Sequence, residues 1–125
     1  MSDKRWKQIE RWWASILGGI RIPVTGRHSA DVPDIAHPYW AIEVKYSNAP
    51  PARILKGLEQ AKRAAKARSS DLMPILCQSY HVKGERDLRH LVTMEVDDWL
   101  KIAKLWEREH KPVYGWKDEG KDIKL

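Results

Sequence analysis

The chain has 125 residues, 42% of them hydrophobic and 32% charged, and its lysines and arginines exceed its acidic residues by six. This length supports one hydrophobic core, and the positive charge favours a polyanionic partner such as nucleic acid. No apolar run approaches the roughly 20 residues of a membrane span, and the single cysteine, Cys77, excludes an internal disulfide and a cysteine-based zinc site.

Residues 4–18 are predicted to form an amphipathic helix, because apolar side chains recur on one face and Gly18-Gly19 supplies a stop. Glu10 is expected at the border of that apolar face, and Arg11 nearly opposite it. A carboxylate at the border can reach a site beside the helix, or it can be an ordinary solvated residue.

Three extended segments are predicted next, over residues 20–24, 32–36 and 40–46. Pro23 favours an edge position for the first of them. The polar turn at 25–31 offers hydroxyls, backbone N–H groups and basic side chains that can hold a phosphate, although an ordinary loop has the same composition.

The third segment carries Glu43 and Lys45 on one face and Val44 on the other, because side chains alternate along a strand. Asp34 can add a second carboxylate from the neighbouring strand, and Asp31 is the competing choice. Two carboxylates suit Mg²⁺, and a lysine beside them can orient or deprotonate a water. This set predicts metal-assisted phosphodiester hydrolysis. The alternative is a surface ion pair worth about 0–1 kcal/mol.

The second half of the chain is predicted to contain a helix, two strands and another helix, over residues 52–68, 73–80, 90–94 and 96–109. The first of these helices carries six cations against one acid, which indicates either a rim that contacts the nucleic-acid backbone or a solvated face. Cys77 is expected to be buried. The tail over residues 110–125 is expected to be partly flexible or to pack on a partner subunit.

Pro33-Asp34 followed by Glu43-Val44-Lys45 resembles the acidic core of the PD-(D/E)xK nuclease superfamily. With Glu10 on the first helix and Thr25 in the polar turn, the order of residues is similar to that of its Holliday junction resolvase branch, the archaeal-type and phage-encoded small resolvases. The resemblance covers residues from about 5 to 66, half of the chain.

We therefore predict an α/β fold, a single nuclease domain over residues 1–125, with a central mixed β-sheet flanked by helices and a restriction-endonuclease-like αβββαβ core. The residues that match catalytic positions are Glu10, Thr25, Asp34, Glu43 and Lys45. Metal ligands are expected at Glu10, Asp34, Glu43 and Val44. Contacts with DNA are expected at Arg11, Arg21, Arg27, Gln60, Lys62, Arg63 and Lys66. Either Arg21 or Arg27 is the functional arginine.

The resemblance implies a Mg²⁺-dependent DNA endonuclease, with Mn²⁺ as the alternative ion, that acts as a homodimer on four-way junctions or other branched DNA. A four-way junction has approximate two-fold symmetry, which suits a dimer with two active sites. Seven tryptophans in a small chain also favour a subunit interface or a nucleic-acid surface. The alternatives are another nuclease of the repair or restriction type and a non-catalytic basic nucleic-acid-binding module.

The N-terminus, Met1-Ser2-Asp3-Lys4-Arg5-Trp6, lacks the apolar core of a signal peptide. We therefore expect an intracellular, cytoplasmic protein with no membrane partner. If a phage encodes the chain, the compartment is the host cytoplasm.

Overall fold

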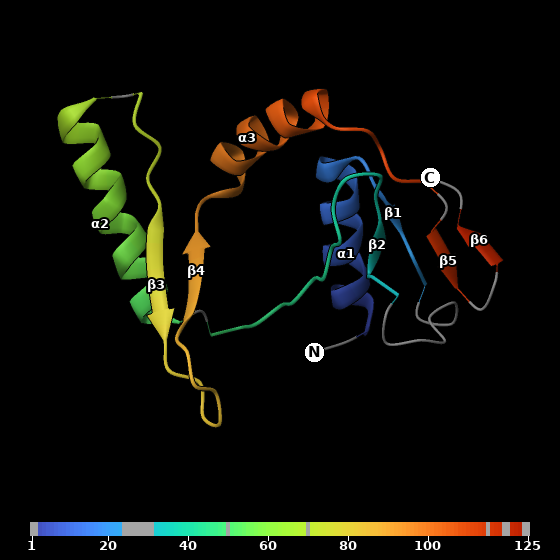
Figure 1. The fold of residues 1–125 in the computed structure, drawn as a ribbon, viewed down its shortest axis with the longest axis horizontal. Helices are drawn as coiled ribbons and strands as arrows, with labels where there is room; N and C mark the ends of the chain where they lie inside the picture. The colour runs from blue at the N-terminus through green and yellow to red at the C-terminus, as the bar shows by residue number, and fades with distance from the viewer. Residues whose placement is uncertain are drawn as a thin grey trace. The chain divides into compact units, whose positions relative to one another are not determined.

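The chain folds as an α/β protein (Figure 1). The computed structural model describes residues 3–23, 32–49, 51–69, 71–114, 116–118 and 121–123. The chain divides into two compact units, one of Met1–Ser47 with Leu105–Leu125 and one of Asn48–Lys104. A single nuclease domain stays a prediction. None of the helices in the described ranges is long and apolar enough to cross a membrane.

The first unit begins with helix α1 (Asp3–Leu17), which confirms the first predicted helix. The helix ends where Gly18 adopts a positive φ of 77° and the N–H groups of Gly18 and Gly19 both donate to the carbonyl of Ala14. A Cβ on Gly19 would lie 2.6 Å from Cγ2 of Ile35. Glycine therefore permits the close approach of the end of α1 to Ile35.

Two strands follow α1, and both are shorter than predicted. β1 (Ile20–Arg21) pairs antiparallel with β2 (Ile35–Ala36), and Ile35 also forms a single β-bridge with Ile42. The third predicted strand is thus reduced to one bridge. Hydrogen bonding explains this, because the N–H of Val44 donates to the side chain of Asp34 and not to a backbone carbonyl of a neighbouring strand.

The core of this unit joins the helix, the second strand and the bridged segment. Its members are Ala14, Ile35 and Val44, with Ile9, Trp13 and Ile42 packed against them. Ile35 is fully buried. Burial of Val44 in this cluster holds the Glu43-Val44-Lys45 segment against α1 and β2, and so fixes the place of the candidate site.

The second unit contains a helix packed against a β-hairpin (Figure 1). Helix α2 (Ala52–Arg68) confirms the second predicted helix. The strands β3 (Leu76–Tyr80) and β4 (Arg89–Thr93) confirm the two predicted strands, and they pair antiparallel. The helix and the hairpin touch at Gly57, where a Cβ would lie 2.8 Å from Cδ1 of Leu76. The absence of a side chain at Gly57 lets the helix lie close to β3.

Helix α3 (Val96–Glu109) confirms the last predicted helix, and its first turn carries Asp97 and Asp98, which favour a helix N-terminus. After it, β5 (Trp116–Asp118) and β6 (Lys121–Ile123) form an antiparallel hairpin that was not predicted. This hairpin lies within the segment that we expected to be a partly flexible tail.

Two predictions about the fold are wrong. The strands in the described ranges form three separate two-stranded antiparallel sheets and no central mixed sheet. Pro23 follows β1 and Pro33 precedes β2, and a proline has no N–H for a longer ladder. Cys77 is exposed, because it follows Leu76 on β3 and so points away from the face that meets α2.

Candidate active site

Asp34 connects three segments of the first unit, and only 5% of it is exposed. Its N–H donates to the carbonyl of Ile42 at 3.1 Å, and its carbonyl accepts the N–H of Ile22 at 3.0 Å. Its carboxylate Oδ2 accepts the N–H of Val44 at 2.7 Å. The Asp34 side chain is therefore fixed against the middle residue of Glu43-Val44-Lys45, the neighbourhood that the sequence predicted.

Glu43 and Lys45 point outward from that contact. Their side chains are 60% and 85% exposed, whereas Val44 is buried in the core. Nζ of Lys45 lies 3.5 Å from Oε1 of Glu43, so the two side chains share one side of the segment, as the alternation predicted. An exposed pair of this kind is weakly held in water, and a ligand can displace it.

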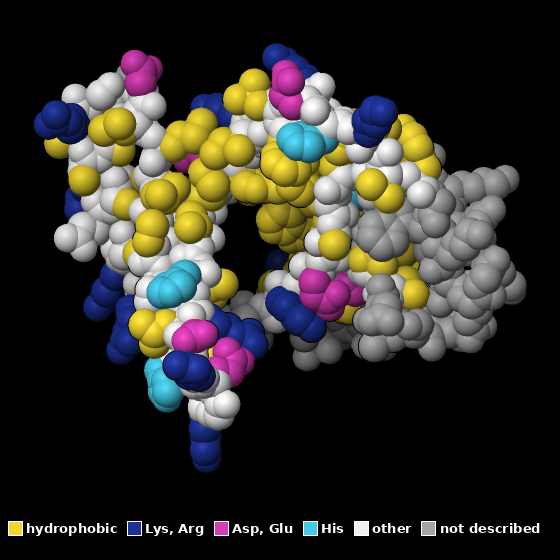
Figure 2. All heavy atoms as spheres, in the orientation of Figure 1, with side chains coloured by type: hydrophobic (Ala, Val, Ile, Leu, Met, Phe, Trp, Pro, Cys, Tyr) yellow, Lys and Arg dark blue, Asp and Glu magenta, His cyan; other side chains and the backbone are white. Residues whose placement is uncertain are grey.

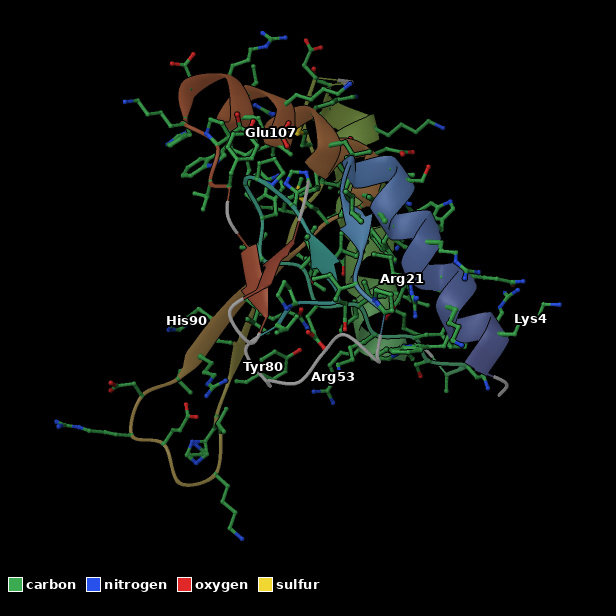
Figure 3. The ribbon with its side chains drawn as sticks, turned by 90° about the vertical axis from the view of Figure 1, so that its right-hand side faces the viewer. Lys4, Arg21, Arg53, Tyr80, His90 and Glu107 are labelled. Atoms are coloured by element: carbon green, nitrogen blue, oxygen red, sulfur yellow. The ribbon has the colours of Figure 1, made fainter. Side chains whose placement is uncertain are left out.

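A buried ion pair joins α1 to β1 (Arg21 is labelled in Figure 3). Nε of Arg21 donates to Oε1 of the fully buried Glu10 at 2.8 Å, and 12% of the Arg21 side chain is exposed. Nη2 of Arg21 is buried and has no hydrogen-bond partner in the described part of the chain. The ring of Trp6 lies 6.0 Å from Cζ of Arg21. We expected Glu10 at the border of the apolar face of α1, but its side chain is fully buried. The ion pair with Arg21 explains this burial.

This ion pair bears on the choice between Arg21 and Arg27 and on the access of a ligand to Glu10. Of the two candidate arginines, Arg21 is the one bonded to Glu10, and Arg27 lies outside the described residues. Thr25 and Asp31 lie outside them as well. The carboxylate of Glu10 is closed off from solvent, in contrast to that of Glu43, so the two acids offer a ligand different access.

The side chains predicted to contact DNA differ in whether they are exposed or already bound to another side chain. Arg11 on α1 is exposed, and so are Gln60, Arg63 and Lys66 on α2. Figure 2 shows Lys and Arg side chains along the outer side of α2. Lys62 is engaged instead, because its Nζ lies 2.8 Å from Glu95 and 3.4 Å from Glu59. The hydrogen bond to Glu95 is the main reason that the pKa of Lys62 is raised above 10.5.

The oxygen ligands near Asp34 suit a hard cation by their chemistry. The carboxylate of Asp34 accepts the N–H of Val44, and Glu43 directly precedes Val44 in the chain; carboxylate and carbonyl oxygens are what Mg²⁺ prefers. No group of three or more His, Cys, Asp or Glu residues that could hold a metal ion occurs among the residues described. A metal held by Asp34 and Glu43 would take backbone, water and phosphate oxygens to complete its shell.

A buried histidine beside β2 was missed in the sequence. Nδ1 of His37 accepts the N–H of Tyr39 at 3.0 Å, and Nε2 lies 2.7 Å from the carbonyl of Leu17. This pairing requires the proton on Nε2. Oε1 of Glu107 lies 3.8 Å from the same nitrogen. His37 thus holds the end of α1 next to residues 37–39. A lone histidine after an apolar strand gives no signal that would distinguish this role from that of a ligand.

No family model, no curated protein and no solved structure matches the chain.

Proposed function

We propose that the chain is a Mg²⁺-dependent DNA endonuclease of the PD-(D/E)xK type, and that it resolves four-way junctions. The observation that carries this proposal is the hydrogen bond from the N–H of Val44 to the carboxylate of Asp34, which joins the two halves of the motif. A chance surface ion pair between Glu43 and Lys45 has no need of a buried aspartate anchored ten residues upstream.

The order of elements along the chain also supports the proposal. α1, β1, β2 and the bridged segment around Ile42 precede α2 and β3, which is the αβββαβ order of the nuclease superfamily. Glu10 lies on α1, and Asp34 directly precedes β2, an order along the chain that supports the resemblance.

In this proposal, Asp34 and Glu43 would hold the metal ion, and the backbone carbonyl of Val44 would be a further oxygen ligand. A bound Mg²⁺ would supply a Lewis acid for the phosphodiester and an activated water. Lys45 extends into solvent, so its ammonium can reach a phosphate oxygen or a water of an approaching strand. Glu10 and Arg21 act from the interior as a positioning pair that fixes α1 to β1. The roles of Thr25 and Arg27 rest on the resemblance alone.

We also propose that two copies act together inside the cell, because paired nicks in a junction need two active sites within one binding event. The DNA contacts of this proposal are Arg11 in the first unit and Gln60, Lys62, Arg63 and Lys66 on α2, whereas Arg21 is bonded to Glu10 and acts as a positioning residue. Lys62 would have to leave Glu95 to contribute, since the two are hydrogen-bonded without DNA.

A non-catalytic nucleic-acid-binding module is the second candidate. It is favoured by the lack of a three-ligand metal cluster in the described ranges, together with the direct pairing of Lys45 and Glu43. Both candidates expect DNA binding, so only cleavage separates them.

The experiment compares a labelled four-way junction with matched duplex, Y-fork and single strand, each incubated with the purified chain and Mg²⁺. The nuclease proposal expects paired nicks in the junction that disappear with EDTA and return with Mg²⁺ or Mn²⁺. Lys45→Ala should lower the single-turnover rate by about 10²–10³ and keep junction binding. Lys83→Ala, an exposed lysine of the β3–β4 turn, is the matched control and should cleave normally. Binding without nicking by the unaltered chain would favour the module.

A further inference from the structure

The outer face of α1 is a cationic surface of which the proposed function uses Arg11 alone. Lys4, Arg5, Lys7 and Arg11 are all exposed on this helix, and Lys4 projects away from the ribbon in Figure 3. Among the α1 side chains that the structure describes, the one acid is Glu10, which is buried against Arg21. Nothing acidic among these side chains therefore offsets the four cations on the solvent side.

An exposed tryptophan lies on the same helix as these cations. Trp12 is 51% exposed, and its ring meets that of Trp13 edge to face at 5.0 Å with an interplanar angle of 83°. Trp13 in turn packs against the core of the first unit. Trp12 is thus held on one side by a core residue while much of its ring faces water. A single exposed apolar residue needs no explanation, but a fixed indole on the same helix as four exposed cations combines the two features that bind unpaired nucleotides.

This surface continues toward the candidate active site. Cζ of Arg5 lies 6.0 Å from the centre of the Tyr46 ring, and Tyr46 directly follows Lys45. The path from Lys45 through Tyr46 and Arg5 onto the outer face of α1 lies within the first unit. A strand that leaves the scissile position can follow it while its phosphates meet cations.

We propose that the outer face of α1, made of Lys4, Arg5, Lys7, Arg11 and Trp12, binds single-stranded DNA, with Trp12 stacking on an unpaired base. The cations match the phosphates of the strand. The preference for a single strand follows from Trp12, because a base within duplex DNA is already stacked on its neighbours. This inference rests on the proposed function in so far as it takes DNA as the partner, and it assigns a surface and a strand type that the active site does not specify.

The test measures binding of a short fluorescent oligothymidylate and of a duplex of equal length to the full chain in EDTA. We expect Trp12→Leu to weaken single-strand binding by about tenfold or more and to abolish the part of the tryptophan quenching that comes from stacking. Trp12→Tyr keeps a stacking ring and should retain most of the affinity. Trp106→Leu is the control, because Trp106 is similarly exposed at 48% and lies on α3. An unchanged affinity in Trp12→Leu, or an equal loss in Trp106→Leu, would overturn the proposal.

A second arm tests the cations through salt dependence. Removing Lys4 and Lys7 together as glutamines should lower the slope of log Kd against log salt by about 1.4, since each phosphate contact contributes about 0.7 for a single strand. Lys101→Gln with Lys104→Gln removes the same charge from exposed positions of α3 and should leave the slope unchanged. Because these binding measurements contain no metal, they test the α1 surface separately from cleavage. Normal nicking together with unchanged binding by Trp12→Leu would reject only the α1 surface. Stacking on Trp12 without any nicking would reject only the nuclease proposal.

Discussion

Replacing Glu10 by glutamine tests whether the buried Glu10–Arg21 ion pair stabilises the first unit. The substitution keeps the size of the side chain and removes its charge. Glu10 is fully buried and Arg21 is 12% exposed, so water cannot replace the lost carboxylate. Leaving a buried charge without its partner costs about 3–5 kcal/mol. We expect a loss near the lower end of that range, because glutamine can still accept the hydrogen bond from Nε of Arg21.

Urea unfolding followed by circular dichroism measures this loss. A chain of this size has a free energy of unfolding of about 5–15 kcal/mol, so the midpoint should fall markedly while the slope stays unchanged. A double-mutant cycle of Glu10→Gln and Arg21→Met isolates the pair, with an expected coupling energy of about 2 kcal/mol or more. The same cycle with Glu43→Gln and Lys45→Met is the matched control on an exposed pair, with an expected coupling of about 0.5 kcal/mol or less. Equal coupling in the two cycles would refute the argument from burial.

Asp34→Asn keeps an oxygen that can accept the N–H of Val44, so we expect stability to change by about 1 kcal/mol while Mg²⁺-dependent nicking falls at least about 10²-fold; normal nicking would remove Asp34 from the site. The raised pKa of Lys62 means that its contact with Glu95 stabilises the fold below pH 10.5 and is lost as the pH rises through the folded-state pKa. The thermal stabilities of the unaltered chain and Lys62→Met should therefore differ below pH 10.5 and converge above the raised folded-state pKa of Lys62, and a gap that persists beyond that pH would contradict this. Sedimentation at micromolar concentration without DNA should show a dimer; a monomer that also stays single on a four-way junction would exclude paired incision.

The helices could be predicted from the sequence because their signals are local. α2 and α3 have the predicted bounds, 52–68 and 96–109, since apolar periodicity and flanking breakers depend only on neighbouring residues. The sequence does not show that the third predicted strand, residues 40–46, is reduced to a single β-bridge. Its N–H at Val44 is taken by the carboxylate of Asp34, and that competition depends on tertiary structure.

The same difference between local and tertiary signals applies to the candidate site. The outward direction of Glu43 and Lys45 follows from alternation around an apolar Val44, which a sequence shows directly. The partner of Glu10 could not be predicted in this way, because helical periodicity assigns Glu10 only to a border position. Its full burial depends on Arg21, which lies on β1 eleven residues further along the chain, and a single sequence holds no signal for that pairing.

The acids of the first unit differ in what they bond to, and the difference assigns them different roles. Glu10 and Asp34 are buried, and protein donors, Nε of Arg21 and the N–H of Val44, offset their desolvation. Both contacts lie within the protein, so both acids hold their segments in register, and Asp34 is in addition a proposed metal ligand. Glu43 is exposed and pairs with the still more exposed Lys45, so a phosphate can displace that contact at little cost. If cleavage occurs at this site, the buried acids Glu10 and Asp34 keep the segments of the site in place. Glu43 and Lys45 are then the side chains that exchange their contact with each other for a contact with a phosphate or a metal.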